Sequence, residues 1–446
     1  MNVREICEFF WFIERKYGLL SDPRKQRQWA PFRFMLYYYI TQKVGLFENP
    51  HPVSGKRKMS GFFFQFFKRN PFISHSHKSL ALIPLLRRVN SEDIYSSEVL
   101  KIFNDKLDVI DQEASGSALS GSLLFDPFIH LGFLLVKVLR ITRRRFFKVE
   151  MSEVNLWFSE FSHKFGVPLK EIQDIYLTNK IKFEVFGWIY FILFSIKRYK
   201  TVFLVGSYFQ MYIVEAAKRA GSRVIELQHG VITPYHLGYS YPDQEENYFF
   251  PDELWCYGGF WSENTAMPRN AIFKILHPSF MKRLSDLGGV PIKKNKLAVF
   301  SSQGVVGTKI FEFALASAQL NPDYNIIFRL HPSEDLNKYQ DLLASQTPFL
   351  ENFKLSHKEP NIFLLMSQAE YVVGVFSTTI FEAIYLNAKI ILLDMPGIEY
   401  MSAVISRNEA TVIKTAKDFR AACENAKRVD PSYYYSESSS LDLGEL

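Results

Sequence analysis

Residues 371–394 read YVVGVFSTTIFEAIYLNAKIILLD. Two short apolar runs, 371–375 and 389–394, flank a helical stretch that opens at Ser377-Thr378-Thr379. Apolar runs of this length without polar alternation are typical of strands that are buried on both faces of a parallel sheet. The stretch therefore predicts a β-α-β unit.

The same pattern extends in both directions from this unit. Similar short strands, alternating with helical segments, predict a Rossmann-like domain over residues 296–430. A second α/β unit is expected to end near residue 285, after apolar runs at 201–205, 223–227 and 252–257. We therefore predict an α/β protein with two Rossmann-like domains that face a cleft, with extra N-terminal helices. The N-terminal domain, on the acceptor side, is expected to span residues 1–285.

Three segments are less regular. Residues 287–295 (LGGVPIKKN) are expected to link the two units. Residues 1–150 look mostly helical and aromatic, yet they must supply either the remaining strands of the first unit or a separate helical layer. Residues 431–446 (PSYYYSESSSLDLGEL) are expected to form a polar tail that adds little to the core.

The composition narrows the function classes. The chain has 446 residues, of which 48% are hydrophobic and 22% charged, as in globular proteins of two to three domains. Three scattered cysteines exclude a disulfide framework and indicate a reducing compartment, the cytoplasm. The net charge of +7 and the 42 phenylalanines suit nucleic acid, an anionic membrane or phosphorylated substrates. Nucleic acid is disfavoured because no RNA-binding module is present. The motifs of metalloproteases, P-loop NTPases and serine hydrolases are absent as well.

Two apolar runs, 121–139 and 186–196, are too short or too interrupted to span a bilayer and are predicted to be buried core helices. Basic and aromatic residues cluster at 56–69 (KRKMSGFFFQFFKR) and 140–148. Such clusters predict peripheral contact with an anionic membrane. The alternative for the second cluster is a solvated helix end, where cations also favour the helix dipole.

In doubly wound sheets, ligands bind beyond the carboxyl ends of the strands. In the C-terminal unit, three candidate phosphate- and nucleotide-binding groups stand at such ends. The first is His331-Pro332, with Arg329 two residues earlier, and the second is Gln303-Gly304, where glycine allows close backbone approach. The third is Ser377, Thr378 and Thr379, at the start of a helix that holds Glu382. Glu382 is expected either to complete a capping box with Thr379 or to bind a ribose.

In the N-terminal unit, Gln228-His229-Gly230 ends a predicted strand. His229 is a candidate general base, with Glu226 as its orienting carboxylate or as the base itself. The alternative is a structural turn in which Gly230 supplies the backbone freedom. His236 and Tyr239 follow and are expected to face the acceptor.

Taken together, QHG at 228–230, RLHP at 329–332, GVFSTTIFEA at 374–383 and LLDMPGIEYM at 392–401 resemble bacterial glycosyltransferases of the GT-B fold that build surface polysaccharides. The HP and Ser/Thr motifs are similar to those of sialyltransferases, polysialyltransferases and Kdo transferases, which use CMP-sugars. That resemblance implies that His331, Ser377 and Thr378 hold the CMP phosphate. The HG turn also resembles glycerophosphotransferases of teichoic acid synthesis, which implies that His229 is the base. The acidic motif of the sialyltransferases is absent, so both His229 and Glu226 remain candidates.

The resemblance implies sugar transfer from a nucleotide-sugar, in particular sialic acid or Kdo from CMP, to a glycan or lipid-linked glycan of capsule, O-antigen or lipooligosaccharide. We expect no cofactor and no metal, because one phosphate needs little charge compensation and no DxD pair ends a strand. The alternatives are a CDP-glycerol-type glycerophosphotransferase and a non-catalytic nucleotide- or sugar-binding protein. The expected location is the cytoplasm, with peripheral contact to the inner face of the plasma membrane.

Overall fold

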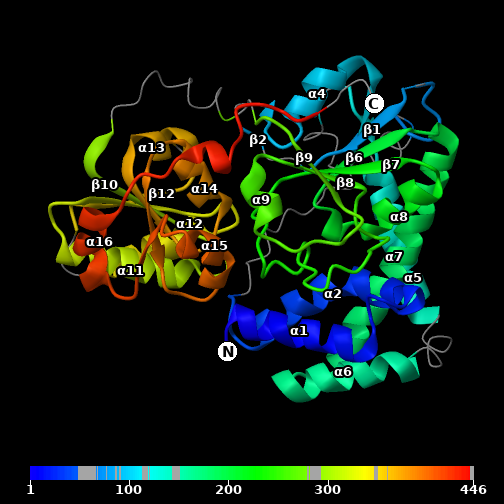
Figure 1. Ribbon diagram of the computed structural model, residues 1–446, viewed down its shortest axis with the longest axis horizontal. Helices are drawn as coiled ribbons and strands as arrows, with labels where there is room; N and C mark the ends of the chain where they lie inside the picture. The colour runs from blue at the N-terminus through cyan, green and yellow to red at the C-terminus, as the bar shows by residue number, and fades with distance from the viewer. Residues whose placement is uncertain are drawn as a thin grey trace.

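The computed structural model describes residues 1–48, 69–76, 78–85, 92–112, 121–142, 151–278, 293–345, 350–358 and 360–441, together with a few isolated positions between them. Two parallel sheets organise these residues, one in each half of the chain (Figure 1). The predicted α/β architecture with two Rossmann-like sheets is thereby confirmed.

The C-terminal sheet has six strands in the order β12-β11-β10-β13-β14-β15, and all of its pairings are parallel. Chain order and sheet order diverge between β10 and β13, as in a doubly wound fold. The strands are β10 (Lys294–Ser301), β11 (Asn325–Arg329), β12 (Phe353–Ser356), β13 (Ala369–Gly374), β14 (Lys389–Leu393) and β15 (Thr411–Ile413). Their connecting helices are α11 (Gly307–Leu320), α12 (Leu336–Ala344), α13 (Ile362–Gln368), α14 (Thr378–Tyr385), α15 (Ser402–Ser406) and α16 (Phe419–Asn425).

The N-terminal sheet has seven strands in the order β5-β4-β1-β6-β7-β8-β9, again with parallel pairings. The first 150 residues supply three of these strands, so they contribute to the sheet as well as to the helices. The strands are β1 (Leu80–Ile83), β4 (Leu107–Asp111), β5 (Leu123–Leu124), β6 (Thr201–Val205), β7 (Arg223–Leu227), β8 (Glu253–Cys256) and β9 (Ile272–Ile275). A short hairpin, β2 (Arg88–Val89) and β3 (Glu92–Asp93), lies between β1 and α4 (Ser97–Phe103).

A layer of helices packs below the N-terminal sheet in the view of Figure 1. Aromatic rings fill the contacts between them: Trp29 packs with Phe161 at 5.7 Å and Phe32 with Tyr176 at 5.2 Å between ring centroids. Much of the aromatic surplus of the sequence is therefore core. The helices are α1 (Val3–Tyr17), α2 (Pro23–Lys43), α5 (Asp126–Thr142), α6 (Met151–Phe165), α7 (Leu169–Lys197) and α8 (Met211–Arg219).

The C-terminal segment corrects the prediction of a polar tail. The chain leaves the C-terminal sheet and crosses back to the N-terminal sheet, where it ends (Figure 1). Tyr434 and Tyr435 are buried, and the indole nitrogen of Trp261 donates to the carbonyl of Tyr434 at 2.9 Å. The amide of Ser440 donates to the carbonyl of Ile275 on β9 at 3.0 Å. The three tyrosines at 433–435 thus anchor the tail in spite of its serine-rich composition.

A second connection joins the N-terminal helices to the C-terminal sheet. The hydroxyls of Tyr37 on α2 and Tyr400 lie 2.5 Å apart. The amide of Glu48 donates to the carbonyl of Val305 at 2.7 Å, and its carboxylate accepts from Thr308 at 3.0 Å. Two segments distant in sequence, the end of α2 and the C-terminal tail, therefore hold the two sheets together.

The two apolar runs expected to be buried helices are buried on one side only. The run at 121–139 contributes strand β5 and most of α5, and the run at 186–196 lies in α7; both helices carry exposed apolar side chains. Among the described residues, no helix is both long and apolar enough to cross a membrane. The basic clusters predicted to contact membrane, 56–69 and 140–148, lie largely outside the described residues.

Candidate active site between the two sheets

The carboxyl ends of the two sheets meet around a small cavity. Gln228, His229 and Gly230, which follow β7, line one side of it. Thr378 and Glu382 of α14 line the other. The volume that the centre of a water molecule can occupy inside it is about 10 Å³, room for about one water molecule and far below the roughly 300–1,000 Å³ of ligand pockets. The remaining wall is largely aromatic and comprises Ile94, Tyr95, Tyr257, Trp261, Phe381 and Tyr435.

His229 is the imidazole that the N-terminal sheet contributes to this cavity. Its Nε2 lies 3.3 Å from the hydroxyl of Tyr208, and the ring of Tyr95 approaches it edge-on at 5.9 Å. Its buried Nδ1 has no hydrogen-bond partner among the described residues. Burial lowers the pKa of His229 to about 4, so the imidazole is neutral near pH 7. A neutral imidazole is able to accept a proton.

Gln228 shapes the turn that presents His229. Its side-chain nitrogen donates to the carbonyl of Gly230 at 3.1 Å, and its side-chain oxygen accepts from the amide of Tyr257 at 2.9 Å. The hydroxyl of Tyr257 in turn donates to the backbone carbonyl of Gln228 at 2.6 Å. Sequence reasoning noted Gln228 only as part of a motif and missed this role, because Tyr257 is 29 residues away.

Glu226 and Tyr239 bond to each other rather than facing the cavity. The hydroxyl of Tyr239 donates to the Glu226 carboxylate at 2.6 Å, and the amide and hydroxyl of Ser207 donate to the same carboxylate. Both side chains are almost fully buried, and burial raises the pKa of Glu226. Among the described residues, no hydrogen bond joins Glu226 to His229, although Glu226 was predicted to orient it. Tyr239 was predicted to face the acceptor, but its side chain is buried.

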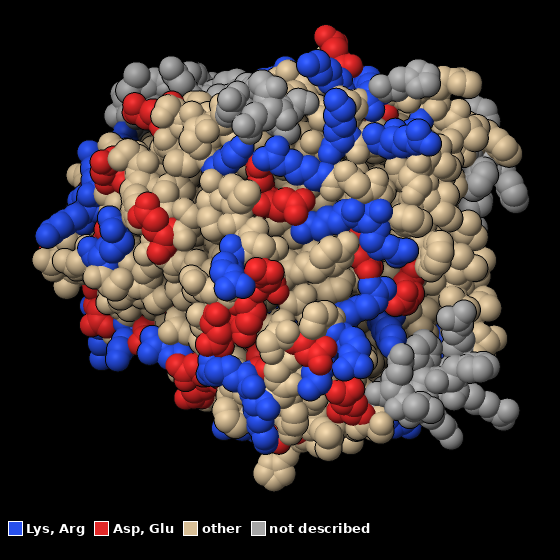
Figure 2. Space-filling model, turned by 45° about the vertical axis from the view of Figure 1, so that its right-hand side comes forward, with Lys and Arg blue, Asp and Glu red and all other residues tan. Residues whose placement is uncertain are grey.

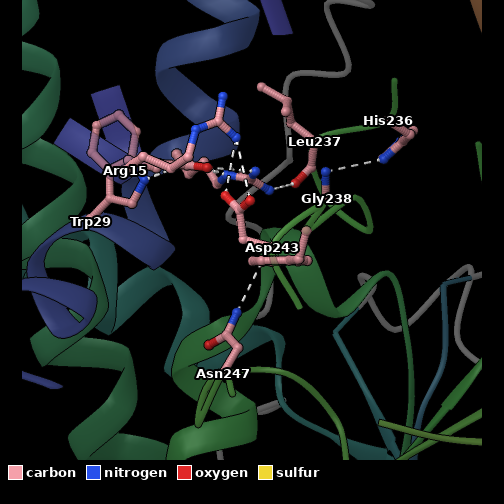
Figure 3. Close-up of polar contacts among 10 residues, drawn as sticks. Arg15, Trp29, His236, Leu237, Gly238, Asp243 and Asn247 are labelled. Carbon is pink, nitrogen blue, oxygen red and sulfur yellow. Dashed lines mark hydrogen bonds and ion pairs between the residues drawn. The ribbon is translucent and has the colours of Figure 1, made fainter. Parts of the chain in front are cut away.

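His236 lies next to Tyr208, whose ring also stacks with that of His229. Its ring stacks on Phe34 at 5.2 Å and meets Tyr208 edge-on at 4.9 Å. Its Nδ1 accepts from the amide of Gly238 at 3.2 Å (Figure 3). Burial lowers the pKa of His236 to about 3, so this ring is also neutral.

A buried ion pair holds the loop that carries His236. Arg33 of α2 pairs with Glu14 of α1, and both are almost fully buried. Arg33 also donates to the carbonyl of Leu237, while Trp29 donates to Glu14 at 2.7 Å (Figure 3). The ring of Tyr241 lies 4.5 Å from the guanidinium. The N-terminal helices thereby fix a loop of the candidate site.

On the C-terminal sheet, His331 and Pro332 are exposed beyond β11. Nδ1 of His331 lies 2.6 Å from the hydroxyl of Ser333, and its amide donates to Glu334 at 2.6 Å. Glu334 also accepts from Ser302 at 2.9 Å and from Tyr339 at 2.5 Å. Glu334 thus organises the His-Pro loop, a role that the sequence pattern did not reveal.

Gln303 and Gly304 lie beside this loop, at the end of β10. A Cβ on Gly304 would lie 3.6 Å from Nδ1 of His331, which places the two predicted groups side by side. The buried side-chain oxygen of Gln303 has no partner among the described residues. Arg329, by contrast, points to the edge of the sheet, where it donates to Ser356 at 2.8 Å and to the carbonyl of Pro360 at 2.7 Å. These contacts differ from the prediction, which placed Arg329 beside His331 in a phosphate site.

The start of α14 departs from the predicted capping box. Ser377 is the N-cap residue, and its hydroxyl accepts from the amide of Thr379 at 3.2 Å. Thr379 lies inside the helix, so Glu382 is not at the third helical position that such a box requires. Glu382 is instead buried against the cavity. The amides of Thr379 and Ile380 donate to the hydroxyl and the carbonyl of Ser377. Thr378, the first residue of α14, lines the cavity, which makes this helix N-terminus a candidate anion site.

No cluster of three or more His, Cys, Asp or Glu side chains with metal-site geometry occurs in the described part of the chain. The titratable groups of the candidate site are instead dispersed over two sheets. The arrangement offers a neutral imidazole on one side and a helix N-terminus on the other. It suits the binding of an anion and proton transfer at a neighbouring hydroxyl.

No protein-family model and no curated protein matches the sequence. Solved structures do resemble the chain. The UDP-GlcNAc 2-epimerase of Methanocaldococcus jannaschii in complex with UDP-GlcNAc and UDP is 13% identical, covers 78% of this chain and 94% of its own, and has a TM-score of 0.44. The UDP-GlcNAc 2-epimerase of Neisseria meningitidis bound to UDP-GlcNAc is 14% identical, with 80% and 95% coverage and a TM-score of 0.45. The glycotransferase of kitacinnamycin is 10% identical, with 80% and 93% coverage and a TM-score of 0.47.

Proposed function

We propose that this chain is a glycosyltransferase that uses a nucleotide-sugar donor. The observation that carries the proposal is the shared cavity, in which His229 of one sheet faces Thr378 and Glu382 of the other. Two doubly wound sheets joined at their carboxyl ends provide separate sites for two substrates. Because the cavity is small, we expect the two halves to move apart before a nucleotide-sugar enters.

The donor is proposed to bind at the C-terminal sheet. Its phosphate would accept hydrogen bonds from the first amides of α14 and from the hydroxyls of Ser377 and Thr378. His331 would approach the same phosphate from the neighbouring loop. Glu382 would accept from a ribose hydroxyl. The unpartnered oxygen of Gln303 would accept from the base or the ribose.

His229 is proposed as the general base. It would take the proton of an acceptor hydroxyl while that oxygen forms a bond to the anomeric carbon and the bond from that carbon to the phosphate breaks. The amides at the start of α14 would stabilise the charge on the departing phosphate. His229 is favoured over Glu226 because the Glu226 carboxylate already accepts from Ser207 and Tyr239. His236, which packs against Tyr208, would border the acceptor.

The finer assignment rests on the motif resemblance alone. We propose a CMP-sugar, of the sialic acid or Kdo class, as donor, and a bacterial surface glycan or its lipid-linked precursor as acceptor, with no requirement for a divalent cation. The second candidate is transfer of glycerol phosphate from CDP-glycerol, which the position of His229 beside Gly230 also suits. Either reaction would place the protein at the cytoplasmic side of the membrane.

A thermal-shift panel of CMP, CDP, UDP and GDP and their sugars tests the donor. We expect CMP and its sugars to raise the unfolding temperature and to lose this effect in His331→Ala. Transfer is then measured with the stabilising donor and a glycan acceptor, with and without EDTA. His229→Ala should abolish transfer and retain the donor shift. If a nucleotide binds and no donor is consumed, the protein is a binding protein; if no nucleotide binds, the proposal fails.

A further inference from the structure

The outer surface of α5 and α7 carries an unusual concentration of exposed apolar side chains. On α5, Leu134, Val138 and Ile141 follow helical spacing and point away from the protein, with Ile141 at 72% exposure. On α7, Trp188, Ile192 and Ile196 form a similar stripe, with Trp188 at 56%. We call these six residues the α5–α7 face. Single exposed apolar residues are ordinary, whereas a group of this size on adjacent helices marks an interaction site.

The two helices lie against each other. A Cβ on Gly132 of α5 would lie 2.6 Å from the ring of Phe186 of α7, which shows how closely the helices approach. The rings of Phe133 and Phe186 also meet at 5.3 Å. In Figure 1, both helices lie at the end of the molecule away from the C-terminal sheet, so this face does not cover the candidate active site.

Most of the charges around the face are positive, although Glu184, one turn before Trp188 on α7, is 44% exposed and pairs with Arg27. Residues 127–142 and 185–200 contain no Asp or Glu. Lys137 and Arg140 lie on α5, and Arg198 follows the end of α7. Arg219 of α8 lies over the ring of Phe191 at 4.5 Å and of Trp188 at 5.9 Å. Figure 2 brings this side forward and shows Lys and Arg side chains, interspersed with Asp and Glu, across broad uncharged areas.

We propose that the α5–α7 face binds the surface of an anionic lipid bilayer. An apolar ridge bordered by cations matches the acyl and headgroup layers of such a bilayer, and Trp and Arg suit the boundary between them. A protein partner is less well matched. The ridge of α5 projects outward instead of forming a groove, and lysine is depleted in the centres of protein–protein interfaces. The proposal extends the sequence prediction, which placed the contact at the basic clusters, the second of them beside the apolar run 121–139, and it differs from the expectation that residues 186–196 are buried in the core. It does not depend on the proposed transfer reaction.

Vesicle co-sedimentation of the full chain, without nucleotide, tests the proposal. We expect at least tenfold stronger binding to vesicles of phosphatidylcholine and phosphatidylglycerol (3:1) than to phosphatidylcholine alone. Leu134→Gln with Val138→Gln and Ile141→Gln should reduce binding at least tenfold. A matched control with Ile73→Gln, Ile102→Gln and Leu320→Gln, all exposed elsewhere, should bind like the wild type. Unchanged thermal unfolding of both triple variants confirms that they fold.

Any one of three results would overturn the proposal. These are a wild type that fails to bind anionic vesicles, an α5 variant that binds as well as the wild type, and a control that loses as much binding as the α5 variant. Sedimentation velocity adds a fourth: a dimer that the α5 variant converts to monomer would assign the face to a second copy of this chain. None of these results bears on nucleotide binding, which the thermal-shift panel measures separately.

Discussion

The phenol of Tyr208 contacts two imidazoles, and its hydroxyl lies 3.3 Å from Nε2 of His229. The ring of His236 also packs edge-on against Tyr208, at 4.9 Å between centroids. Burial raises the pKa of Tyr208, so the phenol remains protonated and able to donate. This contact fixes the orientation of His229 and leaves its buried Nδ1 without a partner among the described residues. The orientation of the proposed base therefore depends on a tyrosine in the turn that follows β6 rather than on a carboxylate.

Tyr208→Phe should lower kcat for transfer by roughly fivefold, because it removes one hydrogen bond of about 1 kcal/mol and keeps the ring. KM for the donor should not change, since Tyr208 lies on the acceptor side. His229→Gln should reduce kcat by at least 100-fold. Steady-state kinetics with both substrates varied measures these values. A Tyr208→Phe enzyme that loses donor affinity and keeps kcat would contradict the proposed arrangement.

Stability should depend on pH through His229 and His236. Their pKa values in the folded protein are about 4 and about 3, whereas an unfolded histidine titrates near 6.5. Below pH 6.5 the unfolded chain therefore binds more protons than the folded chain, and the free energy of unfolding falls as the pH decreases toward 4. His229 alone would contribute at most about 3 kcal/mol of this loss.

Urea denaturation at pH 7.5, 6.0 and 5.0 measures this dependence. The double variant His229→Gln with His236→Gln should show a distinctly smaller loss of stability between pH 7.5 and 5.0. His163→Gln, at an exposed site on α6, serves as the control and should retain the wild-type dependence. An equal pH dependence in the double variant would show that other groups cause it.

Much of the fold was predictable because the strands of a parallel sheet are local apolar runs. The strands near 296–301, 325–330, 371–375 and 389–394 were all identified, and so were 201–205 and 223–227. Strand β5 was not, since Leu123-Leu124 is continuous in sequence with the apolar residues of α5. The packing of the C-terminal tail was not predicted for another reason. Tyr434 packs against Trp261, which is 173 residues away, and such a contact cannot be inferred from local composition.

The candidate site was predictable in part. Motifs at strand ends located His229, His331 and the start of α14, because parallel strands place their carboxyl ends on one edge. The direction in which the side chains at these strand ends point could not be predicted from the sequence. Glu226 precedes His229 in the sequence, yet its carboxylate is used by Ser207 and Tyr239. Arg329, two residues before His331, is used by Ser356 and the following loop.

Ser377 permits a test that separates helix capping from phosphate binding. Ser377→Ala removes the cap and should cost about 1 kcal/mol of stability. Ser377→Asp keeps a good N-cap, so stability should remain near that of the wild type, while its negative charge faces the proposed phosphate. We therefore expect Ser377→Asp to weaken nucleotide binding at least tenfold without destabilising the protein.

Isothermal titration calorimetry with the nucleotide selected by the thermal-shift panel measures this affinity, and urea denaturation measures stability. Asp335→Ser is the matched control, because Asp335 is the N-cap of α12 and Ser is an equivalent cap. The control should change neither quantity. If Ser377→Asp binds the nucleotide like the wild type, the phosphate does not lie at the start of α14.

Gly258 tests the role of the C-terminal tail. A Cβ at this position would lie 2.6 Å from the carbonyl oxygens of Tyr433 and Tyr434, and rigid backbone cannot yield to it. Gly258→Ala should therefore displace the tail and lower the free energy of unfolding by about 1–3 kcal/mol. Because Tyr435 lines the cavity, nucleotide affinity should fall as well. Gly230→Ala, whose Cβ would meet no atom within 4 Å, should leave stability unchanged. Limited proteolysis with mass spectrometry should show cleavage after residue 430 in Gly258→Ala alone; a tail that stays protected in this variant would mean that the close approach at Gly258 does not hold it.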